Sequence, residues 1–85
     1  MKTFEYMIKD ELGIHARPAG MLAKAAKSYQ SEITIAKNGR SAVVTRLMAL
    51  MSLGIKCGDT VTVTVSGPDE ESAAEGIRAF FEANL

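Results

Sequence analysis

The sequence lacks tryptophan, has one cysteine and carries no excess of either charge. A single cysteine, Cys57, cannot form an internal disulfide, which excludes the small disulfide-stapled domains. One cysteine and one histidine supply too few ligands for a structural zinc site, so we expect no bound metal. Ten basic and ten acidic residues cancel to a formal net charge of +0, which argues against a nucleic-acid-binding protein.

Long apolar runs are also missing. No segment approaches the ~20 apolar residues of a membrane span, and the N-terminal residues lack the apolar core of a signal peptide. The 85 residues, 47% of them hydrophobic, suffice for one small core. We therefore expect a single domain over residues 1–85, in the cytoplasm and without membrane insertion. The sequence contains no CxxC, HExxH, P-loop or GxGxxG motif.

The first third of the chain predicts a strand followed by a helix. Residues 3–9 alternate as in a half-buried strand, and the residues of one face are Phe4, Tyr6 and Ile8. A turn over residues 10–13 leads to the helix, where apolar residues recur at helical spacing. They are Ala19, Leu22, Ala23 and Ala26.

A β-hairpin is predicted next. Ile33 and Ile35 alternate with polar residues, and the chain returns over residues 40–44. Between them, Asn38 and Gly39 are the residue types that a type I′ turn requires.

The second half predicts helix, strand and helix. The helix in this half that comes before the strand spans residues 45–53, with Thr45 as its N-cap and Gly54 as its stop. Residues 60–66 alternate valine with threonine, which is typical of a strand with one buried face. The last helix has acidic residues in its first turn, and its expected core stripe comprises Ala73, Ala74, Ile77, Phe80 and Phe81.

The element order is thus β-α-β-β-α-β-α. Strands with one apolar face favour an antiparallel sheet with helices on that face. We predict an α+β, open-faced two-layer sandwich, in which three helices cover one face of a four-stranded antiparallel sheet.

His15, the only histidine, lies just before the first predicted helix. A phosphoryl group on its imidazole would meet the backbone N–H groups of Ala16 and Arg17, where the helix dipole favours negative charge. The Arg17 guanidinium would add a cation. The same residues also fit a surface histidine that only caps the helix, and the spacing alone leaves both interpretations open.

The helix over residues 45–53 is apolar on nearly all sides. If Leu50 and Leu53 face the core, the side chains left outside are Leu47, Met48 and Met51. Exposed apolar side chains often mark partner surfaces, and methionines adapt to several partners. The outer stripe of the first helix comprises Arg17, Gly20, Met21, Lys24 and Ser28, whose cations would attract an acidic partner. Alternatively, the methionines fill core gaps and the cations are simply solvated.

Two segments of the chain carry a recognisable pattern: Gly-Ile-His-Ala-Arg-Pro-Ala at residues 13–19 and Leu-Met-x-Leu-Met-Ser-Leu-Gly at residues 47–54. In these segments and in the order of its elements, the whole chain resembles the HPr family, the small histidine phosphocarriers of the bacterial sugar phosphotransferase system. The resemblance implies the same open-faced sandwich.

The resemblance implies that His15 accepts a phosphoryl group on Nδ1 from phosphorylated enzyme I, which takes it from phosphoenolpyruvate. His15 would pass it to the enzyme IIA domains of sugar uptake systems, with Arg17 stabilising the phosphate. The protein would then be a phosphocarrier and not an enzyme, a cytoplasmic monomer without a cofactor. The implied docking residues are Ala16, Arg17, Gly20, Met21, Leu47, Met48 and Met51, rimmed by Lys24.

Two positions depart from the family pattern. Many relatives carry a regulatory serine where this chain has Arg46, so regulation by phosphorylation there should be absent. We expect Arg46 instead to add positive charge to the implied docking surface. Leu12 stands where relatives commonly have a small polar residue, and it offers no hydrogen bond near His15.

Two other function classes compete with the carrier. A regulatory binding module would use the same methionine-rich surface to bind a transcription factor or a metabolic enzyme. A hydrolase would need Asp10 or Asp59 to orient His15, and their spacing does not demand it.

Overall fold

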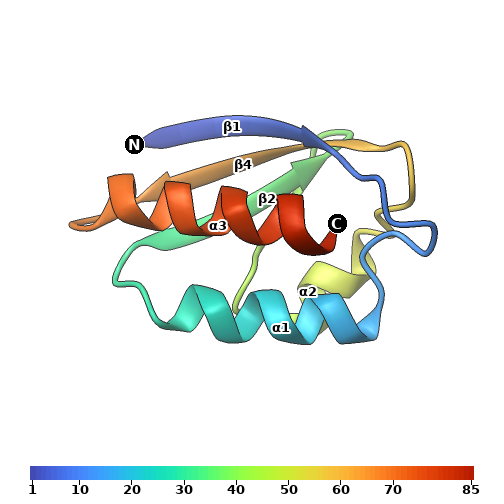
Figure 1. The fold of residues 1–85 in the computed structure, drawn as a ribbon, viewed down its shortest axis with the longest axis horizontal. Coiled ribbons are helices and arrows are strands. Elements are labelled where there is room, and N and C mark those ends of the chain that lie inside the picture. The colour runs from blue at the N-terminus through green and yellow to red at the C-terminus, as the bar shows by residue number, and fades with distance from the viewer.

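Seven elements, in the order that the sequence predicts, are present in the computed structural model, which describes all 85 residues. They are β1 (Lys2–Met7), α1 (Ala16–Lys27), β2 (Glu32–Lys37), β3 (Arg40–Val43), α2 (Leu47–Ser52), β4 (Thr60–Ser66) and α3 (Glu70–Asn84). The strands form one antiparallel sheet in the order β1-β4-β2-β3. Figure 1 shows the helices gathered on one side of this sheet, which confirms the predicted open-faced sandwich.

The core lies between the sheet and the helices. Val61, Val63 and Val65 point inward from β4 and are fully buried, as their alternation predicts. The four predicted core residues of α1 are buried as well. On α3 the stripe is narrower than predicted, because Ala74 and Phe80 are only partly buried. The fully buried residues of α3 are Ala73, Ile77 and Phe81.

The β2–β3 turn has the predicted left-handed conformation. Asn38 has φ of 52° and Gly39 has φ of 80°, and the strands pair directly beside the turn through Lys37 and Arg40. A two-residue turn of this kind matches the twist of the strands that it joins.

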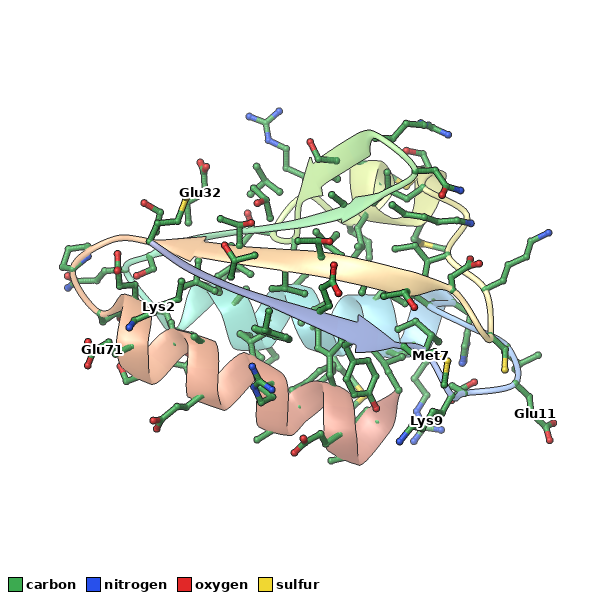
Figure 2. The ribbon with its side chains drawn as sticks, turned by 90° about the horizontal axis from the view of Figure 1, so that it is seen from above. Lys2, Met7, Lys9, Glu11, Glu32 and Glu71 are labelled. Carbon is green, nitrogen blue, oxygen red and sulfur yellow. The ribbon has the colours of Figure 1, made fainter.

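β1 ends two residues earlier than the alternation indicates. Ile8 is buried, but its N–H donates to the carbonyl oxygen of Asp59 in a loop. The N–H groups of Lys9 and Asp10 then both donate to the main-chain oxygen of Leu85, at 2.5 and 2.9 Å. The chain therefore turns away from the sheet, and Figure 2 shows Lys9 already beyond the arrow of β1.

The start of α2 was predicted one residue too early. Arg46, not Thr45, occupies the N-cap position, and its carbonyl oxygen accepts the N–H of Leu50 at 2.9 Å. The predicted stop is confirmed, because Gly54 adopts φ of 63° directly after the last turn.

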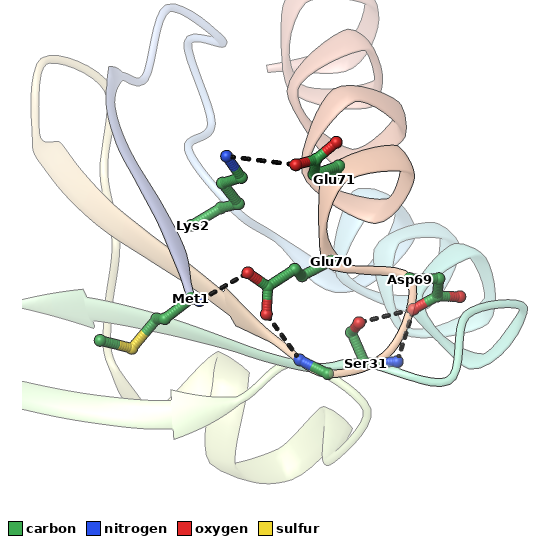
Figure 3. A network of polar contacts seen from close by, with 7 residues as sticks. Met1, Lys2, Ser31, Asp69, Glu70 and Glu71 are labelled. Atoms are coloured by element: carbon green, nitrogen blue, oxygen red, sulfur yellow. Dashed lines mark hydrogen bonds and ion pairs between the residues drawn. The ribbon is translucent and has the colours of Figure 1, made fainter.

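The turn between β4 and α3 is tied to the segment before β2. The Asp69 carboxylate accepts the Ser31 hydroxyl at 2.5 Å and the N–H groups of Gln30 and Ser31 at 2.9 Å. Figure 3 shows this cluster beside the contact between Glu70 and the Met1 amine. These contacts lie at the end of the molecule opposite to the start of α1 (Figure 1).

Candidate functional site

The segment before His15 is held tightly against the loop after α2. Gly13 has φ of 67°, and a Cβ at this position would lie 2.3 Å from the Ile55 carbonyl oxygen. The next residue, Ile14, is buried and donates its N–H to that same oxygen at 3.1 Å. Only glycine fits this approach, so the sequence Gly13-Ile14 fixes where His15 leaves the loop.

His15 occupies the N-cap position of α1, but its side chain makes no capping hydrogen bond. Its carbonyl oxygen accepts the N–H of Ala19 at 2.9 Å and so starts the helix. The N–H groups of Ala16 and Arg17 have no acceptor in the protein. The structure therefore disfavours the helix-cap interpretation of the imidazole and leaves two donors free beside it.

A pocket of about 150 Å³ opens at His15, here called the histidine pocket. Its lining residues are Asp10, His15, Arg17, Pro18, Met21 and Asn84. They come from the loop after β1, the first turns of α1 and the end of α3, which meet at one end of the molecule (Figure 1). The Arg17 side chain is exposed and forms no ion pair, so its guanidinium is free to bind an anion.

Three residues that line the histidine pocket, Asp10, Pro18 and Asn84, are not among the carrier-site residues that the sequence predicts. The sequence could have indicated the turn at Asp10, because an aspartate side chain often accepts the backbone N–H two residues later and so forms an Asx turn. Its Oδ1 indeed accepts the Leu12 N–H at 2.9 Å. Asn84 carried no signal, since it lies 69 residues after His15 and reaches the pocket only through the packing of α3.

The arrangement does not support the hydrolase alternative. Asp59 accepts the Lys37 ammonium group and the Lys56 N–H, both at 2.7 Å, and is absent from the histidine pocket. The bond from Lys37 is the main reason why the pKa of Asp59 lies below its usual value. Asp10 lines the pocket but makes no hydrogen bond to His15. No cluster of three or more potential metal-ligating side chains is present.

An exposed apolar surface lies beside the pocket, on α1 and α2, which contact each other. Met48 is 80% exposed, and the partly exposed neighbours are Met21, Leu47 and Met51. Leu50 and Leu53 are buried, as predicted, so the methionines do not fill core gaps. Around them lie half-buried Gly20 and exposed Lys24. We call Ala16, Arg17, Gly20, Met21, Lys24, Leu47, Met48 and Met51 the docking face.

The formal net charge of +0 conceals an uneven distribution. α1 carries three cations, Arg17, Lys24 and Lys27, and neither α1 nor α2 contains an acidic residue. In contrast, α3 carries a single arginine and the acidic residues Glu70, Glu71, Glu75 and Glu82. The docking face is therefore positively charged, and an acidic partner surface would complement it.

Comparison with known proteins agrees with the observed fold. The family described as "PTS HPr component phosphorylation site" matches residues 2–83. The phosphocarrier protein HPr of Mycoplasma genitalium is 44% identical over 99% of this chain and 97% of its own length. None of the three helices has the length and apolar composition that a membrane-spanning helix requires.

Two solved structures are similar over almost their whole length. HPr from Thermoanaerobacter tengcongensis superposes with a TM-score of 0.93, at 32% identity over 98% of this chain and 93% of that one. A histidine-containing phosphocarrier protein from Mycoplasma gives a TM-score of 0.90, at 35% identity over 93% and 90%. Because the sequence match and the fold match each span nearly the full chain, this protein belongs to the HPr family of phosphocarriers of the phosphotransferase system.

Proposed function

We propose that His15 carries the phosphoryl group in this chain. It receives the group on Nδ1 from phosphorylated enzyme I and passes it to enzyme IIA domains during sugar uptake, as a cytoplasmic monomer. The observation that carries the proposal is the imidazole at the N-cap of α1, which makes no cap bond and lies beside two free N–H groups and an unpaired guanidinium.

The transfer needs only one nucleophile from this chain. The lone pair of the imidazole Nδ1 forms a bond to phosphorus, while the bond from phosphorus to the donor atom breaks and its electron pair stays on the donor. Phosphoryl transfer passes through a loose transition state, so positioning and charge stabilisation supply most of the catalysis. His15 supplies the nucleophile, and the N–H groups of Ala16 and Arg17, which have no acceptor in the protein, can donate to the incoming oxygens.

The stabilising interactions at this site are modest. A phosphoryl group carries about −1.5 to −2 charges, and a helix N-terminus stabilises an exposed anion by ~0.3–1 kcal/mol. A guanidinium ~4 Å away contributes roughly 1–4 kcal/mol, depending on the effective dielectric. A carrier must also release the group, and tighter binding of the phosphorylated form would slow the second transfer. The exposed position of Arg17 suits this requirement.

The docking face lies where a partner would have to bind to reach His15. Its methionines can adapt to two partners of different shape, enzyme I and enzyme IIA. Its cations would speed the encounter with acidic partner surfaces. A single face would then serve both transfers, so that donor and acceptor bind in turn.

Incubation with enzyme I, Mg²⁺ and labelled phosphoenolpyruvate tests the proposal. We expect one acid-labile, base-stable phosphate per chain, and none on His15→Ala. Arg17→Ala should be labelled more slowly, whereas Lys27→Ala, which removes an equal charge from the last turn of the same helix, should behave as the parent protein. Absence of label, or label that survives in His15→Ala, would refute the proposal.

A further inference from the structure

The turn before His15 is built around one acidic residue, Asp10. Its carbonyl oxygen accepts the Gly13 N–H at 2.9 Å, and its carboxylate Oδ1 accepts the Leu12 N–H at 2.9 Å. Its own N–H donates to the main-chain oxygen of Leu85 at 2.9 Å. Asp10 thus joins the turn to the end of α3 and shapes the chain that leads to His15.

The same residue supplies the one carboxylate side chain that lines the histidine pocket. Arg17 is the one side-chain cation there, and the two form no ion pair. Oδ1 of Asp10 is occupied by the Leu12 N–H, whereas no hydrogen bond engages Oδ2. A negative charge therefore stands in the pocket where a phosphoryl group on His15 would bring further negative charge.

We propose that Asp10 is a positioning residue that also raises the phosphoryl-transfer potential of His15: it holds the turn and opposes the charge of the bound group. This inference rests on the proposed function of His15. Arg17 and the free N–H groups stabilise the phosphorylated form, and Asp10 limits how far they do so.

The charge of Asp10 should speed the loss of the phosphoryl group from His15. When the phosphoryl group leaves, the bond between phosphorus and Nδ1 breaks and its electron pair stays on the imidazole. In hydrolysis, water oxygen forms the new bond to phosphorus, and the products are protonated imidazole nitrogen and inorganic phosphate. The loose transition state is metaphosphate-like. Since metaphosphate carries a single negative charge and a phosphoryl group carries about −1.5 to −2, the phosphoryl oxygens are less negative in the transition state than in the phosphohistidine. A fixed carboxylate therefore destabilises the phosphohistidine more than its transition state, and loss of the group is faster.

The variants separate the charge of Asp10 from its hydrogen bond. In Asp10→Asn the amide oxygen still accepts the Leu12 N–H, and in Asp10→Ser the hydroxyl can do so, because both residue types form the same kind of turn. Both remove the charge. Glu11→Gln is the matched control, since Glu11 belongs to the same loop but extends into solvent, as Figure 2 shows.

The measurement is the lifetime of the isolated phosphorylated protein at neutral pH. We expect about three- to tenfold slower hydrolysis for Asp10→Asn and Asp10→Ser, the size that one nearby charge produces at intermediate dielectric. Glu11→Gln should match the parent protein. Urea unfolding of each variant reports whether the fold is kept, and Asp10→Ser serves if Asp10→Asn does not fold.

The equilibrium with phosphorylated enzyme I gives a second readout that a purely structural role would not move. Removing the charge should shift this equilibrium toward the phosphorylated carrier by a similar factor. Parent-like lifetimes in a folded Asp10 variant, or the same change in Glu11→Gln, would overturn the inference and leave the carrier function intact. Failure of the parent protein to be labelled at all would instead refute the proposed function, and this inference with it.

Discussion

The N–H of Ile14 donates a hydrogen bond of 3.1 Å to the carbonyl oxygen of Ile55. This bond joins the segment that carries His15 to the loop that follows α2. This one backbone contact therefore fixes the start of α1 relative to the end of α2, the two helices that carry the docking face. Gly13 makes the contact possible, because any larger residue would collide with Ile55.

Gly13→Ala should accordingly destabilise the protein by more than ~1 kcal/mol, because alanine disfavours positive φ and its Cβ would meet backbone atoms. Gly20→Ala is the matched control. Gly20 lies inside α1 with open space around it, so the same change should stabilise the protein by ~0.5–1 kcal/mol. Urea unfolding of both variants checks this prediction. Equal effects would show that the contact with Ile55 does not constrain the loop.

Helix α2 offers a second contrast between two apolar side chains. Leu50→Ala should cost ~2–5 kcal/mol of unfolding free energy, because Leu50 is 1% exposed. Met48→Ala should change it by less than ~0.5 kcal/mol, because Met48 is 80% exposed. Met48→Ala should nevertheless slow phosphoryl transfer from enzyme I. An unchanged transfer rate in a folded Met48→Ala variant would show that Met48 does not contribute to the docking face.

Acid should destabilise the protein through three carboxylates that are paired in the fold. A hydrogen bond from Lys37 lowers the pKa of Asp59, one from the Ser31 hydroxyl lowers that of Asp69, and one from the N-terminal amine lowers that of Glu70. A lowered folded-state pKa stabilises the protein above the usual carboxyl pKa of about 4, and this stabilisation disappears as the pH falls through the folded value.

The free energy of unfolding should therefore be nearly constant from neutral pH to about pH 5 and fall below it. Asp69→Asn should lower the free energy of unfolding at neutral pH and make its fall at acid pH less steep, because one of the three carboxylates with a lowered pKa is gone. An unchanged acid profile in this variant would contradict the role given to the Asp69 contacts with Gln30 and Ser31.

Arg46, at the N-cap of α2 directly before Leu47, tests the effect of a cation at the edge of the docking face. We expect Arg46→Ser to reduce both the rate of transfer from enzyme I and its dependence on salt, because one cation no longer attracts the acidic partner. The stability should change little, since Arg46 is exposed and makes no side-chain cap bond. Transfer with the parent rate and the parent salt dependence would reject this role.

The local patterns predicted most of the fold. Alternating valines in residues 60–66 indicated β4, and the Asn38-Gly39 pair indicated the hairpin, because each pattern depends only on neighbouring residues. The N-cap of α2 was misplaced because Thr45 has the better capping side chain, yet the backbone at Arg46 supplies the first helical carbonyl.

The sequence predicted only part of the candidate site, because only some of its features depend on neighbouring residues. His15 and the free N–H groups follow from a helix start, which is a local feature. The place of Asp10 in the pocket depends on how residues far apart in the chain pack. Its N–H donates to the main-chain oxygen of Leu85, and Asn84 lines the pocket from α3. No periodicity in the sequence encodes such a contact.

A two-step chase tests the central claim most directly. The protein is labelled by enzyme I and phosphoenolpyruvate, separated from both, and then mixed with purified enzyme IIA domains. The carrier account predicts that label leaves His15 and appears on an enzyme IIA domain, faster than it is released as inorganic phosphate. Label that remains on the chain, or that leaves only as inorganic phosphate with every enzyme IIA domain of the organism, would contradict it.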